Sequence, residues 1–439
     1  MTDLRWQTSH HVQLLRFTTC GSVDDGKSTL IGRLLHDSKS ILEDQYDALK
    51  QASLMRGESE INLANLTDGL RAEREQGITI DVAYRYFATA HRRFIVADSP
   101  GHVQYTRNMV TGASTSSLAL ILVDARQGVI EQTRRHSIIA SLLGIPHLVL
   151  CVNKMDLVNF SQAVFEDIRQ DFIRFSTRLK IKDVTIIPMS ALHGDGVVNP
   201  SPNLSWYLGE PLLPFLESVH IARDLNMDDP RFPVQWVIHT QSTRSSHFRA
   251  FAGQIASGVF KVGDAVLVLP SGRHSTIKAI QLMDRCLPLA YAPMSVSLIL
   301  DDEIDINRGD MIVSAENLPY MSKEVQAMVC WMDTTPLRVG KKYLIKHTTH
   351  STKAMVCHLH HRININNLVE EETPVLRLNE IGRVTLRAAT PLLYDRYQRN
   401  RNLGGFILID ESTYATVGAV LCEEPTKIAP SPEYTDYSI

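Results

Sequence analysis

The stretch Gly21-Ser22-Val23-Asp24-Asp25-Gly26-Lys27-Ser28 follows the pattern G-x-x-x-x-G-K-S of a phosphate-binding loop. Its two glycines allow a tight turn and a close approach of the backbone to a phosphate. The backbone N–H groups of such a loop, and of the helix that follows, face the anion. We expect Lys27 to contact the β- and γ-phosphates and the Ser28 hydroxyl to ligate Mg²⁺, with Thr29 next to them in the same site.

The loop lies in a segment where apolar runs alternate with longer amphipathic stretches, over residues 14–220. Five apolar runs predict buried strands: Leu14–Thr19, Arg93–Ala97, Leu118–Val123, His147–Val152 and Thr185–Pro188. Lys27–Leu35 and Gln132–Leu143 are typical of helices. This alternation predicts a mostly parallel sheet with helices on both faces, and such sheets bind ligands at the carboxyl ends of their strands.

A second motif, Asp98-Ser99-Pro100-Gly101, follows one of these runs. A carboxylate there is placed to hold Mg²⁺ through water, so we assign this role to Asp98. The N–H of Gly101 is expected on the γ-phosphate, which would couple loop position to the bound nucleotide. Thr79, between the phosphate loop and Asp98, is the candidate for a second hydroxyl ligand to Mg²⁺.

The third motif, Asn153-Lys154-Met155-Asp156, predicts which base is bound. A carboxylate accepts hydrogen bonds from guanine N1–H and N2–H₂, whereas adenine offers no such pair, and a site built on paired polar contacts rejects the analogue that lacks them. We expect Asp156 to make this contact, Asn153 to hold the loop and the Lys154 stem to lie over the ring. Further along, Ser190-Ala191-Leu192 is expected to supply an N–H to the guanine oxygen.

His102 directly follows Gly101. An imidazole near the γ-phosphate can orient the attacking water, because phosphoryl transfer needs positioning more than strong base chemistry. We therefore predict that His102 is catalytic, together with Lys27 and Thr79. Val23 and Ile78 are apolar neighbours that fit either a gate for this histidine or simple packing.

Beyond residue 230 the strands become short and closely spaced, which is typical of antiparallel barrels. We predict an α/β P-loop GTPase domain over residues 1–225, β-barrels over 231–318 and 324–425, and a polar tail over 426–439. Glu316–Lys323 is the expected linker. The predicted strands are Val234–His239, Ala250–Ala256, Ala265–Leu269, Thr276–Gln281 and Ser295–Leu300, then Val325–Trp331, Lys342–His347, Lys353–His358, Arg383–Ala388 and Phe406–Asp410.

Composition limits the class of protein. The chain has 439 residues, a net charge of -3 and six scattered cysteines. This charge gives no global footprint for nucleic acid. Cysteines without a C-x-x-C pair favour a reducing compartment, and no apolar run is long enough to span a bilayer, so we expect a cytoplasmic protein. The start of the chain also lacks the pattern of a signal peptide.

Taken together, the motifs resemble those of translational GTPases of the elongation factor Tu and 1A type. A closer resemblance is to the large, GTP-hydrolysing subunits of bacterial sulfate adenylyltransferases. The residues that carry it are Cys20–Leu35, Asp68–Phe87, Gln104–Met109 and Gln127–His136. The Asp24-Asp25 pair and the stretch Asp81–Phe87 separate this family from translation factors.

The resemblance implies a heterodimer or higher assembly with a small subunit. That subunit makes adenosine 5′-phosphosulfate and pyrophosphate from ATP and sulfate, the first step of sulfate assimilation, and GTP hydrolysis on the large subunit drives the reaction. The sequence contains no S-G-G-x-D-S loop and no H-x-G-H motif, so we expect the ATP and sulfate site on another chain. The alternative function is a translation elongation factor that delivers aminoacyl-tRNA; an autonomous regulatory GTPase is a third.

Three other features have open interpretations. The insert His36–Arg74, with a predicted helix over Ile41–Met55, is either a solvated surface or a GTP-sensitive surface that signals to the small subunit. His358 and His360 share a strand face, but no further ligand completes a metal set, which favours surface histidines. The basic stretches Arg338–Lys353 and Arg396–Arg401 lack interleaved aromatics and favour solvated barrel faces or a partner interface over RNA.

Overall fold

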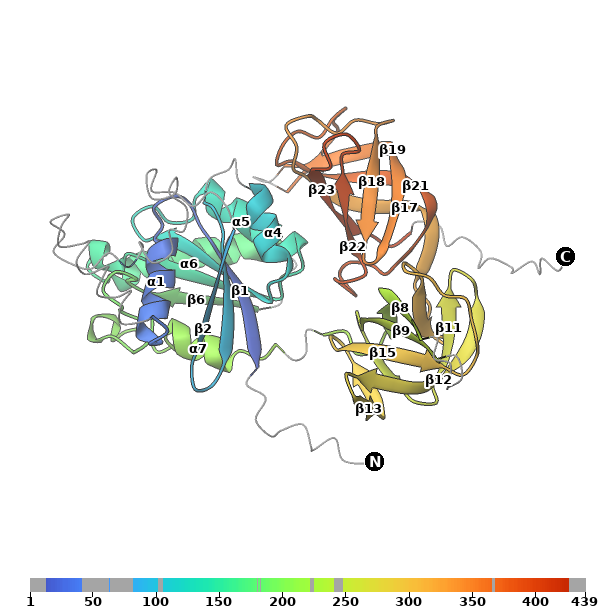
Figure 1. Cartoon of the computed structure of the whole chain (residues 1–439). Helices are drawn as coiled ribbons and strands as arrows, with labels where there is room; N and C mark the ends of the chain where they lie inside the picture. The colour runs from blue at the N-terminus through green and yellow to red at the C-terminus, as the bar shows by residue number, and fades with distance from the viewer. Residues whose placement is uncertain are drawn as a thin grey trace. The chain divides into compact units, whose positions relative to one another are not determined.

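The computed structural model describes residues 13–41, 63, 82–101, 106–179, 181, 183–221, 225–240, 248–364 and 368–425. The chain divides into two compact units, Met1–Asp224 and Leu225–Ile439. The first is an α/β unit and the second is built from antiparallel strands (Figure 1). Among the helices in these ranges, none is long and apolar enough to cross a membrane.

The first unit contains a six-stranded sheet in the order β2-β3-β1-β4-β5-β6. Only β2 runs antiparallel to its neighbour, so the predicted mostly parallel sheet is confirmed. Every residue of β4 and β5 is buried, as expected for strands covered on both faces. The strands are β1 (Leu14–Cys20), β2 (Ala83–Ala88), β3 (Arg93–Asp98), β4 (Leu118–Asp124), β5 (His147–Asn153) and β6 (Asp183–Pro188).

Helices pack against this sheet through apolar stripes. Helix α1 (Lys27–Asp37) buries Leu30, Ile31 and Leu34 in the core that also contains Phe17 of β1. Helix α6 (Gln162–Ser176) begins at Ser161, whose hydroxyl accepts from the Val164 N–H and so caps the helix. The remaining helical elements are α4 (Thr106–Ser114), α5 (Glu131–Leu142) and α7 (Leu212–Ser218), with 3₁₀ turns η4 (Met155–Val158) and η5 (Pro202–Leu204).

The register brings the predicted motifs to one edge of the sheet. Thr19 pairs with Asp98 between β1 and β3, and Asp124 pairs with Asn153 between β4 and β5. The last residues of these parallel strands therefore lie side by side. This edge is where a doubly covered sheet binds its ligand.

The first barrel of the second unit is closed by a bent segment. The sheet order is β7-β16-β11-β12-β15-β9-β8, with β13 paired to β12. Since β7 and β8 are separated only by Val234 and Gln235, this one segment joins both ends of the sheet. The strands are β7 (Arg231–Pro233), β8 (Trp236–Thr240), β9 (Phe248–Gln254), β11 (Ala265–Leu269), β12 (Arg273–Leu282), β13 (Arg285–Leu287), β15 (Ser295–Leu300) and β16 (Met311–Ser314), beside the ribbon of β10 (Val259–Lys261) and β14 (Leu289–Tyr291).

The second barrel closes through direct strand pairing. The order β18-β22-β23-β17-β21-β19 returns to its start because β18 also pairs with β19, and β20 extends the sheet beyond β19. Trp331, Tyr343 and Tyr394 are among its fully buried side chains. The strands are β17 (Tyr320–Trp331), β18 (Lys342–His347), β19 (His350–Ile363), β20 (Glu370–Glu371), β21 (Ile381–Tyr394), β22 (Gly405–Ile409) and β23 (Thr416–Cys422).

A buried polar network joins the two barrels. Arg231, 1% exposed, donates to both carboxylate oxygens of Asp395 at 3.1 and 3.2 Å. Arg399 likewise donates to both oxygens of Asp229 at 2.6 and 2.7 Å. A buried arginine and a buried carboxylate each need such partners to offset the loss of water. One residue of the predicted basic stretch Arg396–Arg401 therefore serves this contact.

The structure corrects one predicted boundary. β17 begins at Tyr320, so the expected linker Glu316–Lys323 is too long at its carboxyl end. Met321 and Tyr320 pack against the barrels there, which explains why these residues extend a strand rather than form a loop. The other domain boundaries stay predictions. The predicted helix Ile41–Met55 lies outside the described residues except at Ile41, and the tail 426–439 lies outside them entirely.

Candidate nucleotide site

The phosphate loop runs from the end of β1 to the start of α1. Asp24 and Gly26 adopt positive φ angles of 67° and 92°. A Cβ built on Gly26 would lie 2.4 Å from Nδ2 of Asn153, so only glycine fits there. This is a physical reason for the second glycine of the loop, beyond its fit to the pattern.

Two buried charged side chains make hydrogen bonds with the backbone of the loop. Lys27 is 7% exposed, and its Nζ donates to the carbonyls of Gly21 at 3.1 Å and Ser22 at 2.7 Å. Asp25 is 3% exposed and accepts from the Ser22 N–H at 2.5 Å. Burial lowers the pKa of Lys27, against the attraction of Asp98 and Asp25. Burial also raises the pKa of Asp25, against the Ser22 N–H and the charge of Lys27.

Asp98 ends β3 and is 1% exposed. Its Oδ1 accepts from the Thr19 hydroxyl at 3.1 Å, across the register pair of β1 and β3. The next side chain, Ser99, lies 2.9 Å from the Thr18 hydroxyl and is fully buried. The second motif is therefore attached to the strand that precedes the phosphate loop, and the Asp98 carboxylate is oriented by it.

Gly101 lies against the phosphate loop. A Cβ built on it would meet Lys27 Nζ at 2.4 Å and the Gly21 carbonyl at 2.7 Å. Any side chain larger than hydrogen would therefore displace the lysine or the loop. The fold thus brings the last residue of the second motif beside the lysine of the first, and the predicted contact of the Gly101 N–H with the γ-phosphate stays a prediction.

The Asn153 side chain connects three motifs. It is 2% exposed, and its Nδ2 donates to the Asp25 carbonyl at 2.8 Å. Its Oδ1 accepts from the Ala191 N–H at 2.9 Å. One amide thus ties the phosphate loop to both base-reading segments and satisfies buried backbone groups in each. The predicted holding role of Asn153 agrees with this geometry.

Asp124, which sequence reasoning did not single out, holds the lysine of the third motif. Its carboxylate is 2% exposed and lies 3.0 Å from Lys154 Nζ. The Arg126 guanidinium also contacts it at 2.6 Å. Burial alone would raise the pKa of Asp124, but hydrogen bonds from Arg126 and Lys154 outweigh it and hold that pKa well below its usual range. The available signal was position, since Asp124 ends a buried strand as Asp98 and Asn153 do.

Asp156 has an unused acceptor. Its Oδ1 is buried and has no hydrogen-bond partner among the described residues, while Oδ2 lies 3.9 Å from His193 Nε2. A buried carboxylate oxygen without a donor is costly, so a ligand N–H is the partner that this position lacks. Ser190 and Ala191 are buried, whereas Leu192 is 47% exposed. The side chain of Arg33 donates to the carbonyls of Ala191 and Leu192 and holds this segment.

Two predicted catalytic residues cannot be placed. Thr79 and His102 lie outside the described residues, as does Ile78. Their roles stay predictions. Val23 is described and is 36% exposed at the tip of the phosphate loop. Pro100 and Gly101 are buried.

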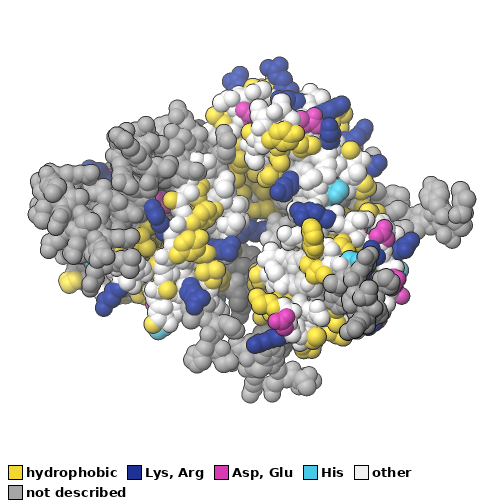
Figure 2. Space-filling model, in the orientation of Figure 1, with side chains coloured by type: hydrophobic (Ala, Val, Ile, Leu, Met, Phe, Trp, Pro, Cys, Tyr) yellow, Lys and Arg dark blue, Asp and Glu magenta, His cyan; other side chains and the backbone are white. Residues whose placement is uncertain are grey.

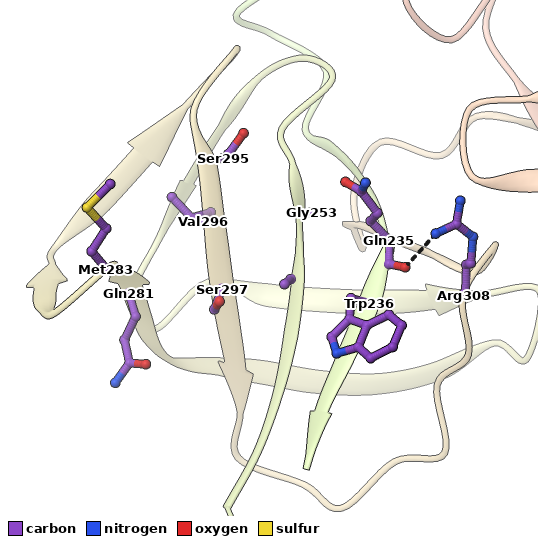
Figure 3. A pocket seen from close by; sticks show the side chains of 10 residues that line it. Gln235, Trp236, Gly253, Gln281, Met283, Ser295, Val296, Ser297 and Arg308 are labelled. Carbon is purple, nitrogen blue, oxygen red and sulfur yellow. Dashed lines mark hydrogen bonds between the residues drawn. The ribbon is translucent and has the colours of Figure 1, made fainter. Parts of the chain in front are cut away.

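A separate groove of about 330 Å³ lies on the first barrel. Figure 3 shows Trp236 and Met283 on opposite sides of a floor formed by small residues such as Gly253 and Ser297. Among the described residues of its lining, Arg308 carries the charge, and it donates to the Gln235 carbonyl at 3.2 Å. The lining residues that the structure describes include no carboxylate, unlike the edge of the first sheet with Asp98 and Asp124.

Comparison with known proteins defines the class. A family model of the elongation factor Tu GTP binding domain matches residues 12–271, more than half of the chain. A GTP-eEF1A C-terminal domain-like model matches residues 324–423. The chain is therefore a GTP-binding protein of the elongation factor Tu class, with the α/β domain and barrels that the sequence predicts.

Relatives narrow the family. A sulfate adenylyltransferase subunit 1 from Bacteroides fragilis is 52% identical, covering 93% of this chain and 86% of the relative. Another from Aliarcobacter butzleri is 49% identical, covering 100% of this chain and 94% of the relative. The chain belongs to the sulfate adenylyltransferase subunit 1 family. A bifunctional enzyme CysN/CysC from Mycobacterium tuberculosis is 54% identical over 95% of this chain and 69% of that relative.

Among solved structures, sup35 complexed with GDP matches at a TM-score of 0.43 and 20% identity, covering 97% of this chain and 98% of that chain. A score this low supports no inference for the present chain.

Proposed function

We propose that this chain is the GTPase subunit of a sulfate adenylyltransferase. GTP hydrolysis here drives the formation of adenosine 5′-phosphosulfate and pyrophosphate from ATP and sulfate on a partner small subunit. Membership in the subunit 1 family supports the reaction. The observation that carries the GTP site is the Asn153 amide, which joins the phosphate loop to the base-reading segments.

The residues present fit a guanine nucleotide. The unpartnered Oδ1 of Asp156 accepts from the base, and the Ala191 segment, held by Asn153, supplies an N–H to the guanine oxygen. Lys27 exchanges its contacts with the loop carbonyls for the β- and γ-phosphates. That exchange is favourable because a buried ammonium gains a charged acceptor in place of two neutral ones.

The donor set also fits Mg²⁺. Ser28 offers a hydroxyl ligand, Asp98 offers a carboxylate that would hold the cation through water, and Thr79 is the proposed second hydroxyl ligand; oxygen groups of this kind are what Mg²⁺ prefers. Asp98 is oriented by the Thr19 hydroxyl and so presents a fixed carboxylate. When bound, the cation neutralises charge on the β- and γ-phosphate oxygens.

Hydrolysis transfers the γ-phosphoryl group of GTP to water and releases GDP. We assign His102 to orienting the attacking water and Lys27 to stabilising charge on the phosphates. The proton of the water leaves with inorganic phosphate, so positioning is the main demand on the protein. Loss of the γ-phosphate then removes the contact with Gly101, which makes loop position depend on the nucleotide.

The partner is the small subunit that carries the ATP and sulfate site, in a heterodimer or larger assembly. The name subunit 1 on the relatives supports the existence of a partner. We place the assembly in the cytoplasm, within sulfate assimilation and cysteine biosynthesis. The cysteines are consistent with a reducing compartment, since all six are free thiols and four of them are buried.

A reconstitution tests this function. The purified chain is mixed with a small subunit from a relative's operon, ATP, sulfate and either GTP or GDP, and adenosine 5′-phosphosulfate is measured. We expect more product with GTP than with GDP, and loss of that gain in Lys27→Ala. If GTP adds no product although both subunits associate, the coupling proposal is wrong.

The translation-factor alternative has less support. On the face drawn in Figure 2, Lys and Arg side chains are interspersed with apolar and neutral ones rather than gathered in a single patch. The net charge of -3 gives no long-range attraction for RNA. We therefore expect no stable complex with aminoacyl-tRNA in an electrophoretic mobility assay at physiological salt.

A further inference from the structure

Helix α5 contacts the second motif through one side chain. Nε2 of Gln132 lies 3.2 Å from the Gly101 carbonyl oxygen. The same nitrogen lies 3.0 Å from Nε2 of His136, one helical turn further along. Residues four apart share a helix face, so this spacing allows both side chains to point toward Gly101. A helix outside the nucleotide motifs is thus bonded to the residue beside Lys27.

The two contacts determine where the protons are. A carbonyl can only accept, so the atom facing Gly101 is the amide nitrogen with its two N–H groups. The second N–H then points at His136 Nε2, which must be unprotonated to accept it. Burial of His136, only 3% exposed, lowers its pKa to about 3, in agreement with a neutral ring. Its proton therefore sits on Nδ1.

That proton has no hydrogen-bond acceptor within the described part of the chain. A buried, unpaired N–H lowers stability, whereas an apolar side chain of similar size would avoid the loss. What His136 contributes comes from its other ring nitrogen, Nε2, which holds the Gln132 amide in one orientation. The pair therefore points a hydrogen-bond donor at Gly101, although the unpaired N–H of His136 lowers the stability of the fold. This combination is typical of a functional contact rather than a packing contact.

Gly101 needs such a restraint. Glycine is the least restricted residue in φ and ψ, and a Cβ that would restrict it is excluded by Lys27 Nζ at 2.4 Å. A hydrogen bond to its carbonyl oxygen limits the peptide unit that continues toward residue 102. With this carbonyl held, rotation about ψ of Gly101 is restricted, which narrows the backbone positions open to this glycine beside Lys27.

We propose that Gln132 and His136 are a positioning pair that fixes Gly101 for contact with the γ-phosphate, so that helix α5 distinguishes GTP from GDP. This inference rests on the proposed function, because it takes the site to bind guanine nucleotides. It assigns a role to two residues outside the nucleotide motifs and predicts a specific consequence of replacing them. Their loss weakens binding of the triphosphate while leaving that of the diphosphate nearly unchanged.

The experiment uses Gln132→Met in the full chain, since methionine keeps length and volume but has no donor. Dissociation constants are measured by fluorescence for a labelled non-hydrolysable GTP analogue and for labelled GDP. Loss of one hydrogen bond to the site is expected to raise the constant for the GTP analogue roughly tenfold, and that for GDP less than about twofold. GDP binding also reports that the variant is folded.

Partner variants make the test specific. His136→Leu removes the acceptor and should match Gln132→Met, and the double variant should be no worse than either one. His136→Gln restores an acceptor near the position of Nε2 and should recover GTP binding. The control is Glu131→Gln on the same helix, whose side chain is 63% exposed and makes a 3.5 Å ion pair with Arg135. It should change neither constant.

Two results overturn the inference. One is an equal rise of both constants in Gln132→Met, which would indicate general damage to the site. The other is no change in either constant. Both are separable from failure of the proposed function, in which the unaltered chain would bind neither nucleotide or would bind them independently of Lys27.

Discussion

Replacing Asp124 by alanine tests whether a buried carboxylate outside the motifs positions the base-reading lysine. Asp124 is 2% exposed and lies 3.0 Å from Lys154 Nζ. It also accepts from the Arg126 backbone N–H at 2.9 Å and from Nε at 3.0 Å. Lys154 itself has a positive φ of 61° and directly precedes the 3₁₀ turn η4.

The expected loss of binding free energy follows from how exposed Lys154 and Arg126, the two partners of Asp124, are. A hydrogen bond to a charged group contributes roughly 1.5–3 kcal/mol when its partners are shielded. Lys154 is 23% exposed and Arg126 is 51% exposed, so water screens much of the interaction. We estimate a loss of about 1–2 kcal/mol in nucleotide binding, or roughly fivefold to thirtyfold in Kd.

The base is common to GTP and GDP, so Asp124→Ala should raise both dissociation constants by the same factor. It should leave kcat at saturating GTP unchanged, because a uniform loss of binding does not alter the chemical step. This pattern differs from that expected for Gln132→Met. Fluorescence titration with both labelled nucleotides and a single-turnover hydrolysis assay provide the measurements.

A double-mutant cycle with Lys154→Ala shows whether Asp124 acts through the lysine. In the Lys154→Ala background, Asp124→Ala should add little. The control is Asp171→Ala, since Asp171 is 43% exposed and makes a 3.6 Å surface ion pair with Arg134. Full additivity of Asp124→Ala and Lys154→Ala would refute the reasoning, as would an effect no larger than that of the control.

Three further predictions concern the same chain. Lys27→Ala should abolish GTP hydrolysis and weaken nucleotide binding at least a hundredfold, and unaltered turnover would remove the phosphate-loop assignment. Asp156→Asn should shift selectivity from guanine toward xanthine nucleotides, measured by competition; retained GTP selectivity counts against the base-reading role. Hydrogen bonds from Arg399 lower the pKa of Asp229 in the folded chain, so this contribution to stability is complete above the unfolded value near pH 4 and declines as the pH falls further. Melting temperatures of the unaltered chain and of Asp229→Asn should therefore approach each other as the pH falls below about 4, and a difference that stays constant down to about pH 3 would contradict this.

Much of the candidate site follows from local sequence because each motif depends on short-range geometry. The Gly21–Ser28 loop needs glycines where the chain turns and a lysine at the helix start, and both requirements are local. The buried strands can also be recognised from the sequence, since β4 and β5 are apolar runs with no alternation. Ala265–Leu269 and Lys342–His347 are predicted with the bounds that β11 and β18 have.

Strand boundaries that depend on tertiary packing were harder to predict from the sequence. β19 and β21 extend well beyond the predicted strands, because long-range pairing and β-bulges continue the ladder through polar residues. The strand β2 was not predicted, since its alternate residues face solvent and its support comes from pairing with β3. The strands that pair with these elements lie far away in the sequence, and no local pattern predicts that pairing.

The order and spacing of residues by themselves determined that this chain binds a nucleotide, which base it is expected to select and which family it belongs to. Only the tertiary structure showed that Asp124 reaches Lys154 and that Gln132 reaches Gly101. The reason is physical: the motifs are short-range solutions to binding phosphate and base, whereas their support comes from residues on neighbouring strands and helices. Such residues become partners only when the sheet places the ends of its strands along one edge.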